Sequence, residues 1–98
     1  VNNLSCDEWD ATYGKIYSGL IQAGAQTVMV GHIAQPAYQK SYNTDFPNKL
    51  IPATLSSELL KGLLRKKLGF NGLIVTDSTC MVGFSCAMNR VRAVPYAI

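Results

Sequence analysis

The sequence lacks several features that would place it in a particular class of protein at once. None of its 98 residues belongs to an unbroken apolar run of the ~20 residues that a membrane-spanning helix needs. Its nine Lys and Arg residues form no stripe or block, so the net charge of +3 favours solubility and indicates no nucleic-acid surface. Internal repeats and low-complexity segments are also absent. We therefore expect neither a membrane nor a nucleic acid as a partner.

Cysteine is scarce, and its placement fits neither of the two structural uses of this residue. Cys6, Cys80 and Cys86 are odd in number and contain no CxxC pair, which argues against a disulfide framework and against a zinc cluster. A Gly-rich phosphate loop is absent as well. We expect no metal and no organic cofactor. Reduced thiols favour the cytoplasm over an oxidising compartment, and the compartment is otherwise unknown.

The sequence does contain alternating helical and strand-like patterns. Residues 5–23 predict a helix, because apolar residues recur at helical spacing behind a Ser5–Glu8 capping box, and Gly24 is placed to end it. The apolar, β-branched run over residues 27–33 predicts a strand buried on both faces, as parallel strands are. The elements expected after it are a loop over residues 34–52, a helix over 56–68 ending at Gly69, a second buried strand over 73–76 and a third helix from about residue 85.

This order of elements predicts an α/β fold with parallel strands and flanking helices joined by right-handed crossovers. Two buried parallel strands need further strands on both edges to form a stable sheet. We therefore expect residues 1–98 to form one part of a larger α/β domain, with the remainder of that domain needed to complete the fold.

Two polar residues close the two predicted strands. His32 follows the first strand and Asp77 the second. Because functional residues of parallel α/β folds collect at the C-terminal ends of strands, both side chains should share one rim. From spacing alone, Asp77 is as easily the cap of a turn as a functional carboxylate, and His32 is more often a structural residue than a catalytic one.

A longer stretch around Asp77 resembles a known family. The segment PATLSSELLKGLLRKKLGFNGLIVTDSTCM, residues 52–81, resembles the N-terminal catalytic domain of glycoside hydrolase family 3, and its centre LGFNGLIVTD is the most specific part. Upstream, AGAQTVMVGHI, residues 23–33, is similar to the β-N-acetylglucosaminidase-like branch. The resemblance covers nearly the whole chain and implies that residues 1–98 are a fragment of a (β/α)8 TIM-type barrel.

The resemblance also implies an activity. It predicts a retaining exo-β-glycosidase that hydrolyses terminal β-N-acetylglucosaminyl (β-N-acetylhexosaminyl) residues of a carbohydrate by double displacement, without a cofactor. Asp77 matches the nucleophile that forms the covalent glycosyl-enzyme intermediate. His32 and Met81 match residues of the sugar-binding rim, whereas Ser78 departs from the Ala more usual after the nucleophile. The acid/base of the family is expected to lie outside these 98 residues.

The loop expected over residues 34–52 leaves the same rim as His32. Tyr38 and Tyr42 could stack on a sugar ring there, and Lys40 or Asp45 could bind hydroxyl groups. Other functions stay open: a β-glucosidase of the same family, an inactive isolated fragment that self-associates through exposed sheet edges, or another α/β enzyme in which Asp77 binds a metal or phosphate.

Overall fold

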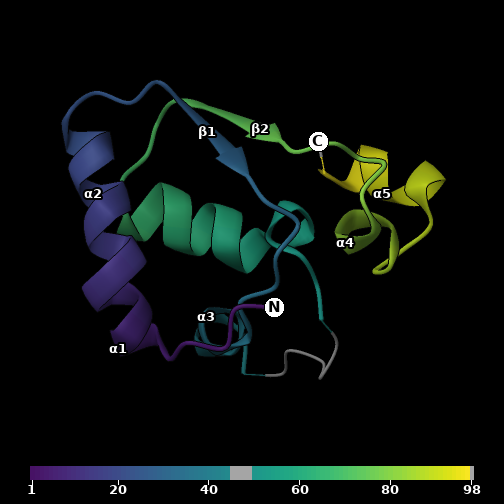
Figure 1. Ribbon diagram of the computed structural model, residues 1–98, viewed down its shortest axis with the longest axis horizontal. Coiled ribbons are helices and arrows are strands. Elements are labelled where there is room, and N and C mark those ends of the chain that lie inside the picture. Colours follow the sequence, from purple (N-terminus) through teal and green to yellow (C-terminus); the bar gives the residue numbers. More distant parts are fainter. Residues whose placement is uncertain (45–49, 98) are drawn as a thin grey trace.

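The computed structural model describes residues 1–44 and 50–97, and it confirms an α/β arrangement with two parallel strands. Strand β1 (Thr27–Val30) pairs in parallel with β2 (Leu73–Thr76), so that Thr27 lies opposite Leu73 and Val30 opposite Thr76. Figure 1 shows both strands pointing toward the side of the molecule that carries α4 and α5. The residues that follow β1 and β2 therefore meet at one edge of the sheet.

The predicted first helix is confirmed and runs without interruption through three segments: α1 (Cys6–Trp9), the π-helical η1 (Asp10–Gly14) and α2 (Lys15–Gln22). Its capping box is formed: the Ser5 amide donates to Glu8 Oε2 at 2.9 Å, and the Glu8 amide donates to Ser5 Oγ at 3.3 Å. Gly24 ends the helix with a φ of +98°, a conformation that glycine adopts without strain.

The segment between the first strand and the second helix is not the loop that the sequence predicts. Helix α3 (Pro36–Tyr42) forms within it, and the 3-10 turn η2 (Ala53–Leu55) follows. The start of α3 is stabilised by the Gln35 side chain, whose Oε1 accepts a 2.8 Å hydrogen bond from the Tyr38 amide. Pro36 occupies the first helical position, where its missing N–H costs nothing. Lys40 is exposed on α3, and Asp45 lies outside the described residues.

The second predicted helix is confirmed, whereas the third differs from its prediction. The π-helical η3 (Glu58–Lys67) begins where Ser56 Oγ accepts from the Leu59 amide at 3.3 Å, and Gly69 ends it with a φ of +70°. The C-terminal region holds two short helices, α4 (Val82–Ser85) and α5 (Arg90–Ala97), because a new helical start at Asn89 interrupts the run. The prediction of one helix from about residue 85 was therefore wrong, because the helical region begins earlier, at Val82, and consists of two helices.

Two small cores hold these elements together. The first joins α1, α3 and η3, and it consists of Trp9, Tyr38, Leu59 and Leu63. The second joins η2 to α4 and α5, and it consists of Leu55, Phe84, Ala87 and Ala93. Across the ranges 1–44 and 50–97, no helix is long and apolar enough to cross a bilayer.

The strands are less buried than the sequence predicts. Met29 is 65% exposed and Leu73 is 62% exposed, so the expectation of burial on both faces is wrong for this chain by itself. The cause is the size of the sheet, since within the described residues each strand has a single neighbour. The first helix behaves similarly: Trp9 of its predicted apolar face is buried, whereas Tyr13 and Ile16 are exposed.

Candidate active site

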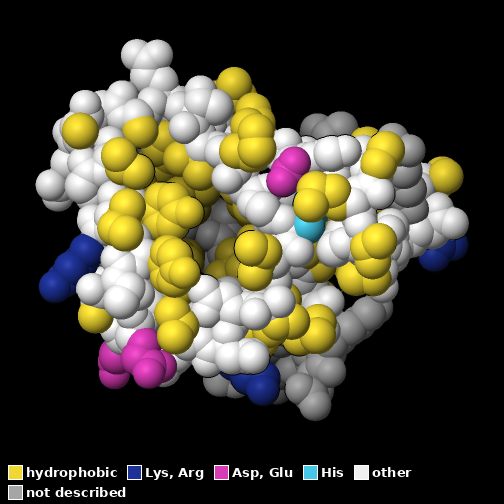
Figure 2. Space-filling view, viewed as in Figure 1, with side chains coloured by type: hydrophobic (Ala, Val, Ile, Leu, Met, Phe, Trp, Pro, Cys, Tyr) yellow, Lys and Arg dark blue, Asp and Glu magenta, His cyan; other side chains and the backbone are white. Residues whose placement is uncertain are grey.

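The C-terminal edge of the sheet brings His32 and Asp77 to one rim. Asp77 directly extends the strand pairing, because its amide donates to the carbonyl oxygen of Val30 at 3.3 Å. Its side chain is half-buried. His32 follows β1 by two residues and is also half-buried. Figure 2 shows an acidic side chain beside the histidine on this face, with hydrophobic side chains around them.

Both nitrogens of the His32 ring are engaged by the protein itself. Nε2 lies 2.9 Å from the carbonyl oxygen of Ser78, and Nδ1 lies 2.9 Å from Thr54 Oγ1. The ring also packs against Phe84, with the ring centres 4.9 Å apart. A backbone carbonyl oxygen only accepts hydrogen bonds, so Nε2 carries the hydrogen in this contact. When the ring carries this one hydrogen, Nδ1 accepts from the Thr54 hydroxyl group.

The loop after Asp77 folds around the Ser78 backbone. The Ser78 amide donates to Asp77 Oδ1 at 2.7 Å, and its carbonyl oxygen accepts from the Met81 amide at 3.2 Å as well as from His32. Met81 precedes α4 and its side chain is 47% exposed. Cys80, whose amide is 3.4 Å from Ser78 Oγ, is exposed in the same loop. The structure therefore brings His32, Asp77 and Met81 together through Ser78.

Sequence reasoning missed three residues that shape this rim. Thr54 is 1% exposed and Phe84 is fully buried, and both contact the His32 ring. At Gly83, an added Cβ would lie 2.7 Å from the His32 carbonyl oxygen, so glycine allows α4 to approach the end of β1 closely. The sequence holds one indication that Thr54 could belong to the site: it lies inside the segment that carries the family resemblance.

Tyr38 lies in the core, and this position does not fit the expectation that it stacks on a sugar. It is 2% exposed, and its ring packs edge-on against Trp9 with the centres 5.4 Å apart. The Tyr38 hydroxyl donates to the Asp10 carboxylate and accepts from the Lys67 ammonium group, and burial raises the pKa of Tyr38 to about 12. The physical reason is that α3 replaces the expected loop and turns Tyr38 toward η3.

Tyr42, at the end of α3, is more accessible. Its ring is 44% exposed and stacks on Tyr38 with the centres 6.1 Å apart. It also covers Gly62 of η3, where an added Cβ would meet the Tyr42 ring at 3.1 Å. Contacts with helices, rather than with the His32 rim, therefore position Tyr42.

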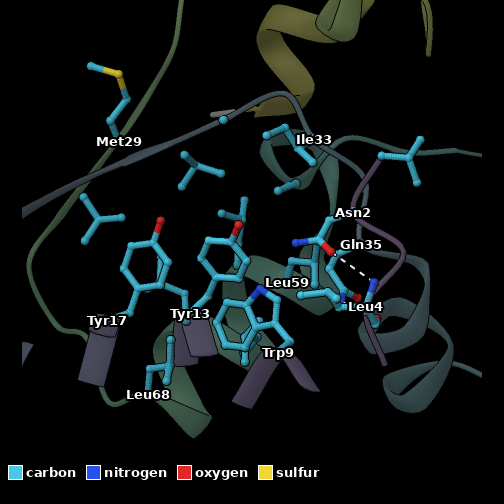
Figure 3. Close-up of a pocket in the computed structure, with 18 of the residues that line it drawn as sticks. Asn2, Leu4, Trp9, Tyr13, Tyr17, Met29, Ile33, Gln35, Leu59 and Leu68 are labelled. Carbon is cyan, nitrogen blue, oxygen red and sulfur yellow. Dashed lines mark hydrogen bonds between the residues drawn. The ribbon is translucent and has the colours of Figure 1, made fainter. Parts of the chain in front are cut away.

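An apolar hollow of about 830 Å³ lies between the strands and the helices, separate from this rim. Figure 3 shows Trp9, Tyr13 and Tyr17 of the first helix projecting into it, with Met29 and Ile33 at its far side. Neither His32 nor Asp77 lines the hollow. Within the described part of the chain, no group of three His, Cys, Asp or Glu residues could hold a metal ion.

The parallel strand pair and the helices that flank it make the chain part of an α/β domain, a class in which active sites commonly lie at the C-terminal ends of strands. Its sequence is more specific: residues 2–98 match the glycosyl hydrolase family 3 N-terminal domain, and the chain belongs to this family.

Curated relatives and solved structures agree with this assignment. The chain is 46% identical over 99 residues to a beta-N-acetylglucosaminidase/beta-glucosidase of Cellulomonas fimi, and 38% identical over 68 residues to beta-hexosaminidase A of Pseudoalteromonas piscicida. These matches cover 100% and 67% of the chain, but 18% and 11% of the relatives. The structure of beta-glucoside phosphorylase BglX bound to 2FGlc superposes with a TM-score of 0.93 at 48% identity, over 98% of this chain and 17% of that one.

Proposed function

We propose that Asp77 is the catalytic nucleophile of a retaining β-glycosidase to which this chain contributes part of the active-site rim. The observation that carries the proposal is the position of the Asp77 carboxylate: it follows β2 directly, is half-buried, and accepts a 2.7 Å hydrogen bond from the Ser78 amide. A backbone donor of this kind stabilises a negative charge and fixes the direction of the carboxylate. Membership of family 3 supports a glycosidic substrate.

The reaction proceeds in two displacements at the anomeric carbon of the sugar, with this carboxylate as nucleophile in the first and leaving group in the second. In the first, an Asp77 oxygen forms a bond to the anomeric carbon while the glycosidic C–O bond breaks and the leaving oxygen takes a proton from a general acid. In the second, a water oxygen attacks the same carbon from the vacated side. The bond between this carbon and Asp77 breaks as the bond to water forms, and the water proton passes to the group that served as acid. We assign that group to a segment outside these 98 residues.

The sugar is proposed to be a terminal β-N-acetylglucosaminyl residue. Two relatives support this substrate by their names: one is a beta-N-acetylglucosaminidase/beta-glucosidase and the other a beta-hexosaminidase. The first name also supports β-glucosides as an alternative substrate. Met81, half-exposed beside the Asp77 loop, is proposed to form a wall of the sugar pocket. Tyr42 is the more accessible of the two tyrosines and stays a candidate for contact with a bound sugar.

A second candidate differs in the acceptor. Two solved structures that are 48% identical to the chain are named beta-glucoside phosphorylase BglX, with TM-scores of 0.93 and 0.94. In phosphorolysis, an oxygen of inorganic phosphate attacks the anomeric carbon of the Asp77 intermediate in place of water and releases a glycosyl phosphate. Because phosphate is already an anion, this second step needs less help from a general base than the attack of water does.

The test is the replacement Asp77→Ala in the full-length protein, assayed with aryl β-glycosides of N-acetylglucosamine and glucose. Turnover should be lost, because the covalent intermediate no longer forms. Added azide should restore release of the aryl group and yield a glycosyl azide of inverted configuration. The matched control Asp7→Ala removes an exposed carboxylate from the start of α1 and should retain activity. Undiminished turnover by Asp77→Ala would rule out the proposed nucleophile.

The acceptor is determined in the same assay. With the unaltered protein, added inorganic phosphate should leave the product as free sugar if water is the acceptor. A glycosyl phosphate, detected by phosphorus NMR or mass spectrometry, would instead favour the phosphorylase. Either product is compatible with Asp77 as nucleophile, so this measurement is independent of the preceding one.

A further inference from the structure

Three hydrogen bonds, joined through the Ser78 backbone, connect a buried hydroxyl group to the Asp77 carboxylate. Thr54 Oγ1 bonds His32 Nδ1 at 2.9 Å, His32 Nε2 bonds the Ser78 carbonyl oxygen at 2.9 Å, and the Ser78 amide bonds Asp77 Oδ1 at 2.7 Å. The two bonds of His32 join residues that are 22 and 46 positions apart in the sequence, so they depend on the tertiary arrangement. The third bond is local, because it links Ser78 to the adjacent Asp77.

Donors and acceptors match along the whole chain. Ser78 presents a carbonyl oxygen to His32, which requires a hydrogen on Nε2. When the ring carries this one hydrogen, Nδ1 presents a lone pair to which the Thr54 hydroxyl group donates. The Ser78 carbonyl oxygen thus places a hydrogen on Nε2, and the Thr54 hydroxyl group, which can donate or accept, adapts to the hydrogen position that this leaves at Nδ1. Neither ring nitrogen is left to bind a sugar hydroxyl while both bonds are in place.

The surroundings hold this arrangement still. Thr54 is 1% exposed, and the His32 ring lies against Phe84, which is fully buried. On the other side, the His32 backbone is in such close contact with Gly83 that a Cβ there would lie 2.7 Å from the His32 carbonyl oxygen. Two hydrogen bonds and an aromatic neighbour hold the ring in one orientation. The hydrogen bond from Nε2 then fixes the position of the Ser78 carbonyl oxygen.

We infer that His32 is a positioning residue for Asp77, acting through the Ser78 backbone and held in its orientation by the hydrogen bond to Thr54. The inference rests on the proposed role of Asp77 as nucleophile. Without His32, the Ser78 peptide groups lose one support, and the amide that holds Asp77 Oδ1 gains freedom to turn away. A nucleophile displaced from its line of attack loses rate in the chemical step, whereas ground-state binding of the sugar changes little.

The experiment compares His32→Leu, His32→Gln, Thr54→Val and Thr54→Ser in the full-length protein, with Asp77→Ala alongside. His32→Leu should lower kcat by about 10- to 100-fold with KM nearly unchanged. His32→Gln should recover part of this loss, because its amide N–H can still donate to Ser78. Thr54→Val should lower kcat less than His32→Leu does, and Thr54→Ser, which keeps the hydroxyl, should match the unaltered protein.

A control separates positioning from loss of stability. Leu63→Ala opens a cavity in the core formed by Trp9, Tyr38, Leu59 and Leu63, so it should lower the melting temperature while leaving kcat unchanged below that temperature. If His32→Leu does not fold, the test uses the kcat and KM of the other three variants. His32→Gln, Thr54→Val and Thr54→Ser nearly preserve side-chain size and should fold.

Several outcomes would overturn the inference. A rise in KM with kcat unchanged in the His32 variants would make His32 a sugar-binding residue. Unchanged kcat and KM in His32→Leu or Thr54→Val would remove the positioning role while leaving Asp77 intact. Full activity of Asp77→Ala would instead show that the proposed nucleophile is wrong, and the role of His32 would be lost with it.

Discussion

Gly83 brings the start of α4 against the carbonyl oxygen of His32, at a distance that leaves no room for a side chain. Gly19 on α2 is its opposite, since an added Cβ there would meet nothing within 4 Å. The two glycines therefore differ in the space available for a side chain. Gly83 permits a close tertiary approach beside the proposed nucleophile loop, whereas Gly19 leaves helical backbone without a side chain to restrict it.

This difference gives a prediction for single substitutions. Gly83→Ala should lower the unfolding free energy by about 1–3 kcal/mol, because α4 or the end of β1 has to move. Gly19→Ala should raise it by about 0.4–1 kcal/mol through reduced freedom of the unfolded chain. Thermal unfolding of the full-length variants measures both. Equal stability of Gly83→Ala and the unaltered protein would contradict the close contact.

At this scale the sequence predicted the strand-end positions of His32 and Asp77 but not what surrounds them. Position at a strand end follows from hydrophobic patterning, which is local. The partners Thr54 and Phe84 are far from His32 in the chain, so only the folded arrangement reveals them. The core position of Tyr38 could not be predicted for the same reason, because its partners Asp10 and Lys67 come from other elements.

Among the elements, one charged cluster joins the first helix to the end of η3 and to α3. Lys67 Nζ lies 2.6 Å from Asp10 Oδ2, and both side chains also bond the Tyr38 hydroxyl. The hydrogen bond from Lys67, and after it the one from Tyr38, lowers the pKa of Asp10. The bond to Asp10 correspondingly raises the pKa of Lys67.

A pH dependence of stability follows from this cluster. Because the pKa of Asp10 is lower in the folded protein, its contribution is present above the unfolded pKa of about 4 and is lost as the pH falls through the folded value. Asp10→Asn should therefore lower the melting temperature at pH 7 and have less effect at pH values below the folded pKa. The loss should be at most about 1 kcal/mol, since both side chains are more than a third exposed.

A double-mutant cycle with Lys67→Met measures the coupling of the two charges directly. The effects of Asp10→Asn and Lys67→Met should be less than additive at pH 7. Additive effects at that pH would mean that the ion pair contributes nothing to stability.

Elements with local signals were predictable, and those without were not. The capping box of α1 and the glycines that end α2 and η3 stand in the sequence beside the helices they bound. Helix α3 also had a signal, Pro36 at its first position, but prolines and tyrosines in a polar segment favoured a loop. The break before α5 depends on Asn89, whose side chain accepts from the Val91 amide at 2.9 Å.

At the scale of the whole molecule, apolar surface remains open on the sheet. Met29 and Leu73 are 65% and 62% exposed, and the hollow of about 830 Å³ is lined largely by apolar side chains. The sequence predicted this situation in one respect, since two buried-type strands are too few for a sheet. It did not reveal the hollow, because the amount of space between helices and strands depends on their packing.

Because of this exposed apolar surface, the isolated 98-residue chain should self-associate. It should also be inactive, because the acid/base group is assigned to a segment outside it. Size-exclusion chromatography with light scattering measures the association, and Met29→Lys with Leu73→Lys should reduce it by placing charge on the exposed strand positions. A monomeric, stably folded isolated chain would contradict this prediction.

The central claim is that Asp77 forms a covalent bond to the sugar, and active-site labelling tests it most directly. The full-length protein is incubated with a 5-fluoro glycosyl fluoride in its glucose and N-acetylglucosamine forms, and the labelled peptide is mapped by mass spectrometry. We expect the adduct on Asp77, formed faster from the N-acetylglucosamine reagent. Labelling of another residue, or no labelling of a folded protein by either reagent, would contradict the claim and return Asp77 to the role of a turn residue.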